Sequence, residues 1–181
     1  MLRPPKLPKP RVALVLSALV LAGCSTTPLT SEVIANGELV RTDRTVAGRA
    51  ELRQTGDGLA VRIVASGFEP GVRALHLHQQ GRCEGPTFTS AGAHLNPHGR
   101  THGQLSETGR HLGDLPNLEV PNGGTIDVTS RIEGSLAAIL PHIFDADGTA
   151  VMIHAGADDY RSDPTGGAGA RIACAILQPA N

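Results

Sequence analysis

The residues of this chain most able to do chemistry are its histidines, eight of them beside only three Phe, one Tyr and no Trp. His76 and His78 are one residue apart, so a strand would place both imidazoles on one face, with Leu75 and Leu77 on the other. Two imidazoles at this spacing can bind one metal ion. A single His-x-His motif is weak evidence for a metal site, because a surface-facing pair or chance explains it about half the time.

Four further candidate ligands follow within 21 residues: His94, His102, His111 and Asp114. The surrounding Gly and Pro residues let the backbone wrap, and these side chains suit a closed tetrahedral site for an ion such as zinc. The alternative is a solvated loop that is rich in histidine but binds no metal. His154, late in the chain, is in isolation more typical of a buried core histidine.

The segments that must position these side chains are predicted to be β-strands. Alternating apolar runs are separated by turns rich in Gly, Pro, Asn and Asp, and no segment has a convincing helical pattern. We therefore expect an all-β fold, an antiparallel sandwich or barrel. The predicted strands are 46–54, 59–65, 72–78, 125–132, 151–154 and 170–177, with long loops at 79–120 and 155–169.

The N-terminal segment is predicted to be a targeting signal. Four basic residues precede an apolar run at 12–21, which is too short to cross a bilayer as a helix and ends in Leu21-Ala22-Gly23-Cys24. This ending resembles the bacterial lipoprotein cleavage box. Residues 1–23 would then be a signal peptide, Cys24 the acylated anchor to a membrane, and 24–30 a tether before a domain at 31–181. The alternative is an ordinary signal peptide in which Cys24 is incidental.

Lipidation of Cys24 leaves two cysteines, Cys83 and Cys174. In an exported chain they favour a disulfide over two unpaired buried thiols. Four of the 16 basic residues lie in the predicted signal, which leaves 12 against 17 acidic residues and a net charge of −5. The net negative charge of the predicted mature chain argues against binding to nucleic acid, and the scarcity of aromatic rings argues against a base-stacking surface. An anionic ligand must therefore be attracted by a local arginine.

The order of these residues resembles that of copper/zinc superoxide dismutases of the exported bacterial kind, from about Ser31 to Leu177. The motifs that carry the resemblance are His76-x-His78, Cys83, Ser90-Ala91-Gly92-Ala93-His94-Leu95-Asn96-Pro97, His102-Gly103, Gly109-Arg110-His111-Leu112-Gly113-Asp114-Leu115-Pro116-Asn117, His154-Ala155-Gly156-Ala157-Asp158-Asp159 and Gly169-Ala170-Arg171-Ile172-Ala173-Cys174. The resemblance implies a Greek-key β-sandwich, or flattened barrel, with long metal-binding and Gly-rich active-site loops.

The resemblance also implies roles for individual residues, with one copper and one zinc per subunit. His76, His78, His94 and His154 would bind copper; His94, His102, His111 and Asp114 would bind zinc, so that His94 is shared. Asp158 would orient one histidine of each metal. Arg171 would receive the substrate anion, His94 would supply a proton, and Cys83 would pair with Cys174. His98 and His142 match no ligand position and are expected to be solvated surface residues.

The function that these expectations support is the dismutation of superoxide to oxygen and hydrogen peroxide in the cell envelope, on the periplasmic side of a membrane or at the cell surface. The alternative is an envelope protein that buffers copper or zinc on the same scaffold without turnover. A scaffold with degenerate sites would lack ligands, and none is missing here. Family members occur as dimers and as monomers, so a homodimer is a candidate assembly.

Overall fold

The computed structural model describes Met1 and residues 31–180. The predicted signal peptide, the acylated Cys24 and the tether therefore lie outside the described residues, apart from Met1. Among the described residues, no helix is long and apolar enough to cross a membrane.

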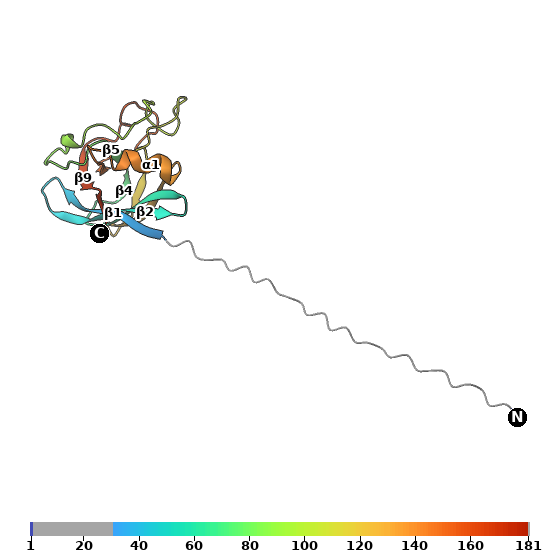
Figure 1. Ribbon diagram of the computed structural model, residues 1–181. Helices are drawn as coiled ribbons and strands as arrows, with labels where there is room; N and C mark the ends of the chain where they lie inside the picture. Colours follow the sequence, from blue (N-terminus) through green and yellow to red (C-terminus); the bar gives the residue numbers. More distant parts are fainter. Residues whose placement is uncertain (2–30, 181) are drawn as a thin grey trace.

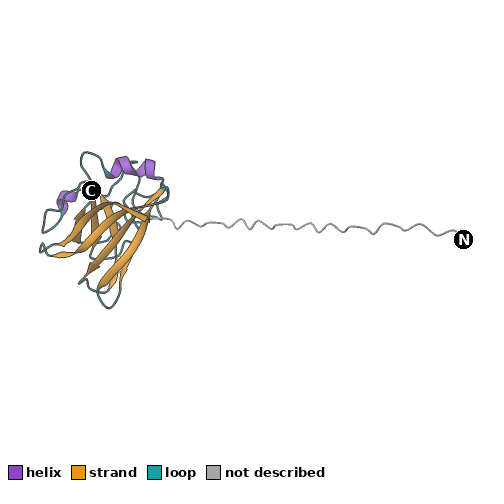
Figure 2. Cartoon of the chain, turned by 60° about the horizontal axis from the view of Figure 1, so that its bottom comes forward, coloured by secondary structure: helices purple, strands orange, loops and turns teal. Residues whose placement is uncertain are grey.

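The fold is built around one antiparallel sheet that curls into a half-barrel (Figure 2). Its strand order is β5-β8-β9-β1-β2-β3-β7, with β10 paired to β1 and a separate β4–β6 pair. The bounds are β1 Ser31–Arg41, β2 Val46–Thr55, β3 Gly58–Ser66, β4 Gly71–Arg73, β5 Leu75–His78, β6 Leu118–Val120, β7 Thr125–Ile132, β8 Ala150–His154, β9 Arg171–Ile176 and β10 Gln178–Pro179. Two short helical elements complete the fold, η1 at Thr89–Ala91 and α1 at Leu136–Ile143.

The strand order confirms the expected Greek-key arrangement. Strands β1, β2 and β3 are joined by hairpins, and the chain then crosses to β4 and β5 before returning to place β7 beside β3. A second crossing, which contains α1, leads from β7 to β8 beside β5. These crossings leave β5 with β8 on one side only, and its other edge is available to the long loop that follows it.

Alternation along the strands separates a packed interior from an outer face. In β5, Leu75 and Leu77 are fully buried in the main core, while His76 and His78 point to the opposite face. In β8, Val151 and Ile153 belong to the same core. The outer face of β5, β8 and β9 carries a second, smaller apolar cluster made of Phe88, Ala91, Ala150, Met152 and Cys174. The outer face here is therefore covered rather than solvated.

Most of the predicted strands are confirmed. The short strands β6 and β10 were not predicted, and β6 lies in the expected loop at 79–120. Two further differences concern β4–β5 and β1. The predicted strand 72–78 is interrupted at Ala74, so that β4 pairs with β6 while β5 pairs with β8. Strand β1 was not predicted, and it contains the pair Asn36-Gly37, which is common in turns. In the structure the chain passes straight through this pair, which stays in register with β2. Residue 37 is glycine because a Cβ there would lie 2.0 Å from the Ile176 carbonyl oxygen.

The expectation of no helix is wrong, since α1 covers residues 136–143. Leu136, Ile139, Leu140 and Ile143 follow the i, i+3, i+4, i+7 spacing of an apolar helical face and pack against the main core. Its first amide, that of Leu136, donates to the Asp57 carbonyl oxygen at 2.6 Å, which fixes the helix to the β2–β3 turn. Pro141 lies inside the helix, where it lacks the N–H of an intrahelical hydrogen bond.

The predicted disulfide is present between Cys83 and Cys174, which are 91 residues apart in sequence. It joins the loop after β5 to strand β9, beside the smaller apolar cluster. In the chain-entropy description, closing a loop of this length stabilises a fold by about 4–5 kcal/mol. The segment around residues 80–115, green in Figure 1, is thus fastened to the sheet near its start.

Candidate metal centre

The candidate site lies on the outer face of the sheet, under the two long loops. His76, His78 and His154 come from the adjacent strands β5 and β8, and none is more than 2% exposed. The loop after β5 returns along the free edge of that strand: His94 forms an isolated bridge with His78, and Asp114 forms one with His76. The amides of Leu77 and Leu95 donate to Gly113 O and Leu77 O at 2.9 and 2.8 Å. Backbone pairing therefore delivers His94 and Asp114 to the strand histidines.

Four imidazoles converge in what we call the four-histidine group: His76, His78, His94 and His154. Their facing nitrogens lie within 4.8 Å of one another. These nitrogens, His76 Nδ1 and the Nε2 atoms of the other three, are buried and have no hydrogen-bond partner. A buried polar atom without a partner costs about 1–3 kcal/mol, and four such atoms around one point form the cradle of a cation with a preference for imidazole.

A second set of side chains, the carboxylate group, consists of His94, His102, His111 and Asp114. The Oδ1 atom of Asp114 lies 2.9 Å from His94 Nδ1 and 3.1 Å from each Nδ1 of His102 and His111. Its Oδ2 atom accepts hydrogen bonds from the amides of Gly103 and His111 at 2.8 and 3.0 Å, which fixes the carboxylate. Three imidazole nitrogens and one carboxylate oxygen form a tetrahedral donor set of the kind that zinc prefers.

His94 belongs to both groups. Its Nδ1 atom faces Asp114, and its Nε2 atom is one of the unpartnered nitrogens of the four-histidine group. Its ring centroid lies 4.0 Å from that of His76 and 5.5 Å from that of His111, between the two groups. One ring can therefore present a nitrogen to each of two ions.

The second ring nitrogens of most of these histidines are held by the protein. Asp158, which is 3% exposed, accepts from His76 Nε2 through Oδ2 and from His102 Nε2 through Oδ1, both at 2.9 Å. His78 Nδ1 donates to Gly92 O at 2.9 Å, and His154 Nδ1 to Gly169 O at 3.2 Å. Such contacts fix both the orientation and the tautomer of a metal-binding imidazole.

Asp158 in turn is held by residues that the sequence analysis did not select. Asn117 exchanges two hydrogen bonds of 2.9 Å with the Asp158 backbone, and its own amide donates to the Tyr160 hydroxyl at 2.8 Å. A Cβ at Gly166 would lie 2.0 Å from Asp158 Oδ1, so only glycine fits there. The Gly-rich composition of the loop was the available signal for this close approach.

Burial lowers the pKa of three members of the four-histidine group. It lowers the pKa of His78 to about 2, that of His154 to about 3 and that of His94 to about 4, with neighbouring imidazoles adding to the effect for His78 and His154. Burial also lowers the pKa of His102, but hydrogen bonds to Asp114 and Asp158 outweigh it and raise that pKa to about 9. The imidazoles of His78, His94 and His154 are therefore neutral at neutral pH and ready to bind a cation.

Arg171 stands at the start of β9, beside the four-histidine group. Its Nη1 and Nη2 atoms donate to Phe88 O and Gly92 O, both at 2.7 Å, and burial lowers its pKa. Gly92 O also accepts from His78, so one carbonyl oxygen fixes both residues. The remaining donors of the guanidinium are available to a small anion.

Two histidines lie outside both groups, as the sequence analysis expected. His98 is exposed and His142 is partly exposed, and their ring centroids are 5.7 Å apart. All the other histidines of the chain are buried in the site.

Comparison with known proteins identifies a family. The profile of copper/zinc superoxide dismutase (SODC) matches residues 46–177. A Cu-Zn superoxide dismutase of Aquifex aeolicus is 40% identical over 149 residues, covering 80% of this chain and 86% of the relative. A superoxide dismutase-like protein of Bacillus subtilis is 40% identical over 148 residues, covering 77% and 74%.

Solved structures have the same fold. The crystal structure of a SOD-like protein from Bacillus subtilis superimposes with a TM-score of 0.73 at 38% identity, covering 79% of this chain and 97% of that one. The Cu/Zn superoxide dismutase of Brucella abortus, at 24% identity, gives a TM-score of 0.65 over 82% and 100% of the two chains and supports the fold alone.

The different pKa values within the site predict a proton count for metal uptake. At pH 7.5 the metal-free protein should release about one proton when zinc binds, because His102, with a pKa of about 9, is protonated at that pH and must lose its proton. His78 and His154, with pKa values far below 7.5, contribute no proton when copper binds, whereas the neutral His94 ring must give up its remaining N–H proton once both metals are bound to it. Calorimetry in buffers of different ionisation enthalpy measures both counts. If the number of protons released on zinc binding is the same at pH 7.5 and at pH 10, this prediction is contradicted.

Proposed function

The chain belongs to the copper/zinc superoxide dismutase family, and from that premise we propose that the four-histidine group binds its copper and the carboxylate group its zinc. The observation that carries this assignment is the set of four buried, unpartnered nitrogens on His76, His78, His94 and His154. The neighbouring Asp114 oxygen, with three Nδ1 atoms around it, supports zinc in the second group.

The activity is the conversion of two superoxide anions and two protons to oxygen and hydrogen peroxide. When bound, copper supplies the one-electron redox couple for this reaction and zinc supplies a fixed positive charge. The protein provides the rest: it positions the imidazoles, attracts the anion and moves a proton.

We assign anion binding to Arg171. Its guanidinium is fixed by the carbonyl oxygens of Phe88 and Gly92, so its free donors keep a constant position beside His78. The predicted mature chain has a net charge of −5, so the attraction of superoxide depends on this local positive charge. A fixed donor fork next to the site favours docking of a small anion over water.

We assign proton transfer to the Nε2 atom of His94. This ring has one nitrogen toward each group, and it is held on the carboxylate side through Nδ1 and Asp114. Its Nε2 atom can thus gain and lose a proton while the ring keeps its position. With Nδ1 held on the carboxylate side, Nε2 is the atom of this ring that can carry a proton to the reduced substrate.

His94→Ala tests these assignments together. Activity should fall at least about a hundredfold, since one group that binds both metals and carries the proton is lost. Metal analysis of the same variant should show reduced copper and reduced zinc. His142→Ala, which removes a histidine outside both groups, is the matched control and should retain activity and both metals. Equal losses in the two variants would contradict the ligand assignment.

We further propose that the protein is exported and anchored through an acylated Cys24, with residues 1–23 as the signal peptide and 24–30 as the tether of the 31–181 domain. The disulfide supports export, because such bonds persist in oxidising compartments. An extracellular Cu-Zn superoxide dismutase of Haemonchus contortus is 35% identical over 152 residues. The sequence Leu21-Ala22-Gly23-Cys24 supports the anchor. A homodimer stays a prediction, which sedimentation of the metal-loaded protein tests.

Cys24→Ala tests the anchor in the producing bacterium. The wild-type protein should sediment with membranes and partition into detergent. The variant should give no acylated mature protein in either fraction, because only a thiol can accept the lipid. Mass spectrometry of the N-terminal peptide gives an independent readout. An unmodified Cys24 in the membrane-associated wild type would exclude the anchor.

A further inference from the structure

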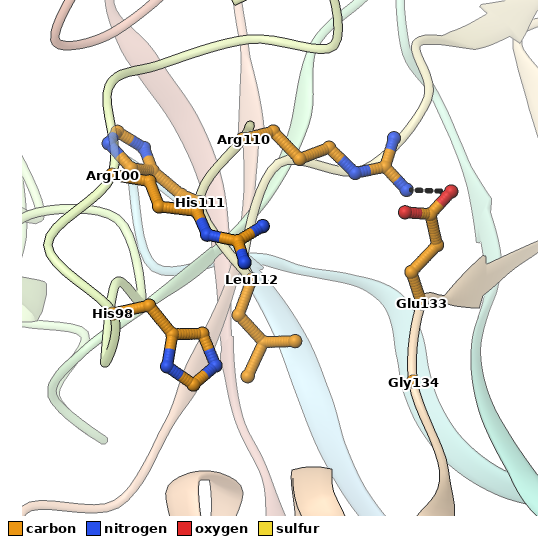
Figure 3. A pocket seen from close by; sticks show the side chains of 7 residues that line it. All are labelled: His98, Arg100, Arg110, His111, Leu112, Glu133 and Gly134. Atoms are coloured by element: carbon orange, nitrogen blue, oxygen red, sulfur yellow. Dashed lines mark ion pairs between the residues drawn. The ribbon is translucent and has the colours of Figure 1, made fainter. Parts of the chain in front are cut away.

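A separate pocket lies on the outer side of the carboxylate group. It has a volume of about 210 Å³ and is lined by His98, Arg100, Arg110, His111, Leu112, Glu133 and Gly134 (Figure 3). One wall comes from the loop that carries His111, and the other from residues 133–134, just after β7. The pocket therefore adjoins His111, and Arg171 is not among the residues that line it.

His111 differs from the other histidines that serve a single metal group. His76, His78, His102 and His154 each use their second ring nitrogen for a carboxylate or a carbonyl oxygen. The Nδ1 atom of His111 faces Asp114, but among residues 31–180 its Nε2 atom has no hydrogen-bond partner. Metal-binding imidazoles almost always donate this second N–H to an acceptor. For His111, which lines the pocket, that acceptor can be a water molecule or a ligand bound there.

The charge of the pocket indicates which acceptor fits. Arg100 forms no ion pair with any described carboxylate. Its side chain lies across Gly109, where a Cβ would come within 2.7 Å of Nη1, and this packing positions the guanidinium. Arg110 is 16% exposed and is held by Glu133, with Nη2 and Oε1 2.8 Å apart. Figure 3 shows both arginine side chains extending into the pocket, with Glu133 as its single carboxylate.

We propose that this pocket binds a tetrahedral oxyanion of the class of inorganic phosphate or sulfate, which accepts a hydrogen bond from His111 Nε2 and ion-pairs with Arg100. Guanidinium groups match the oxygens of such anions, and two of them here outnumber the one carboxylate. The anion completes the contacts of His111 as Asp158 does for His102, so it should slow the loss of zinc. The slower loss of zinc rests on the proposed zinc assignment, whereas the binding of the anion does not.

Sulfate is the probe, because it binds zinc weakly. The metal-loaded protein with its copper reduced is diamagnetic, so titration with sodium sulfate against sodium chloride at constant ionic strength can be followed by NMR. We expect saturable shifts of the amides of Gly109, His111 and Leu112. Arg100→Gln should weaken binding about tenfold, the size of one charge-assisted contact. Arg131→Gln, at an exposed arginine of β7, is the matched control and should bind sulfate as the wild type does. Phosphate in a second series should give the same pattern.

Glu133→Gln separates a loss of binding from a loss of folding. It removes the carboxylate that occupies Arg110, so sulfate should bind more tightly than to the wild type, a gain that an unfolded variant cannot produce. Absence of saturable shifts near His111, or equal sulfate affinity in the wild type and Arg100→Gln, would overturn the site.

The rate of zinc transfer to a chromogenic chelator tests the coupling to His111. Saturating sulfate should slow the transfer several-fold in the wild type and not in Arg100→Gln. Sulfate binding without any change in this rate would overturn the coupling. A protein that shifts with sulfate but contains no zinc by metal analysis would overturn the zinc assignment while leaving the anion site intact.

Discussion

The rest of the structure depends on the burial of imidazole nitrogens that the protein itself does not satisfy. Four of them face one another on His76, His78, His94 and His154. An interior of this kind is unfavourable for a metal-free chain, because each unpartnered polar atom has lost its hydration without gaining a bond. The binding of cations removes that cost, so the free energy of metal binding also stabilises the fold.

The fold divides the work between rigid and adaptable parts. Strands β5 and β8 place three histidines on one covered face of a sheet whose other face is the core. Loops supply the remaining side chains, and they are fastened at several points: the disulfide at one end, backbone pairing along β5, and Asp158 between the groups. Because Asp158 touches His76 and His102, a displacement of one group is transmitted to the other through a single carboxylate. Gly92 O links Arg171 to His78 in the same way.

The alternation of apolar and polar residues predicted those strands in which it runs clearly along the strand. Strands 46–54, 59–65 and 125–132 alternate clearly and were found at those positions. Strand β1, which contains the common turn pair Asn36-Gly37, was not predicted; the close approach of Gly37 to β9 is a contact between distant segments that local sequence does not show. Helix α1 was not predicted, although Leu136, Ile139, Leu140 and Ile143 have helical spacing; Pro141 within it is a residue that is unfavourable inside helices. For the site, spacing indicated His76 and His78 as a pair and His94, His102, His111 and Asp114 as a loop cluster. The convergence of these two sets with His154 depends on tertiary structure, and the role of each residue came from family resemblance. Carbonyl acceptors such as Gly92 O have no side-chain signal in a sequence.

The most direct measurement of the central claim is anomalous diffraction from crystals of the fully metal-loaded protein, with data collected at the copper and zinc absorption edges. The account predicts two separate peaks, copper among His76, His78, His94 and His154 and zinc among His94, His102, His111 and Asp114, with His94 in contact with both. A single ion, or two ions with His94 bound to neither, would contradict it.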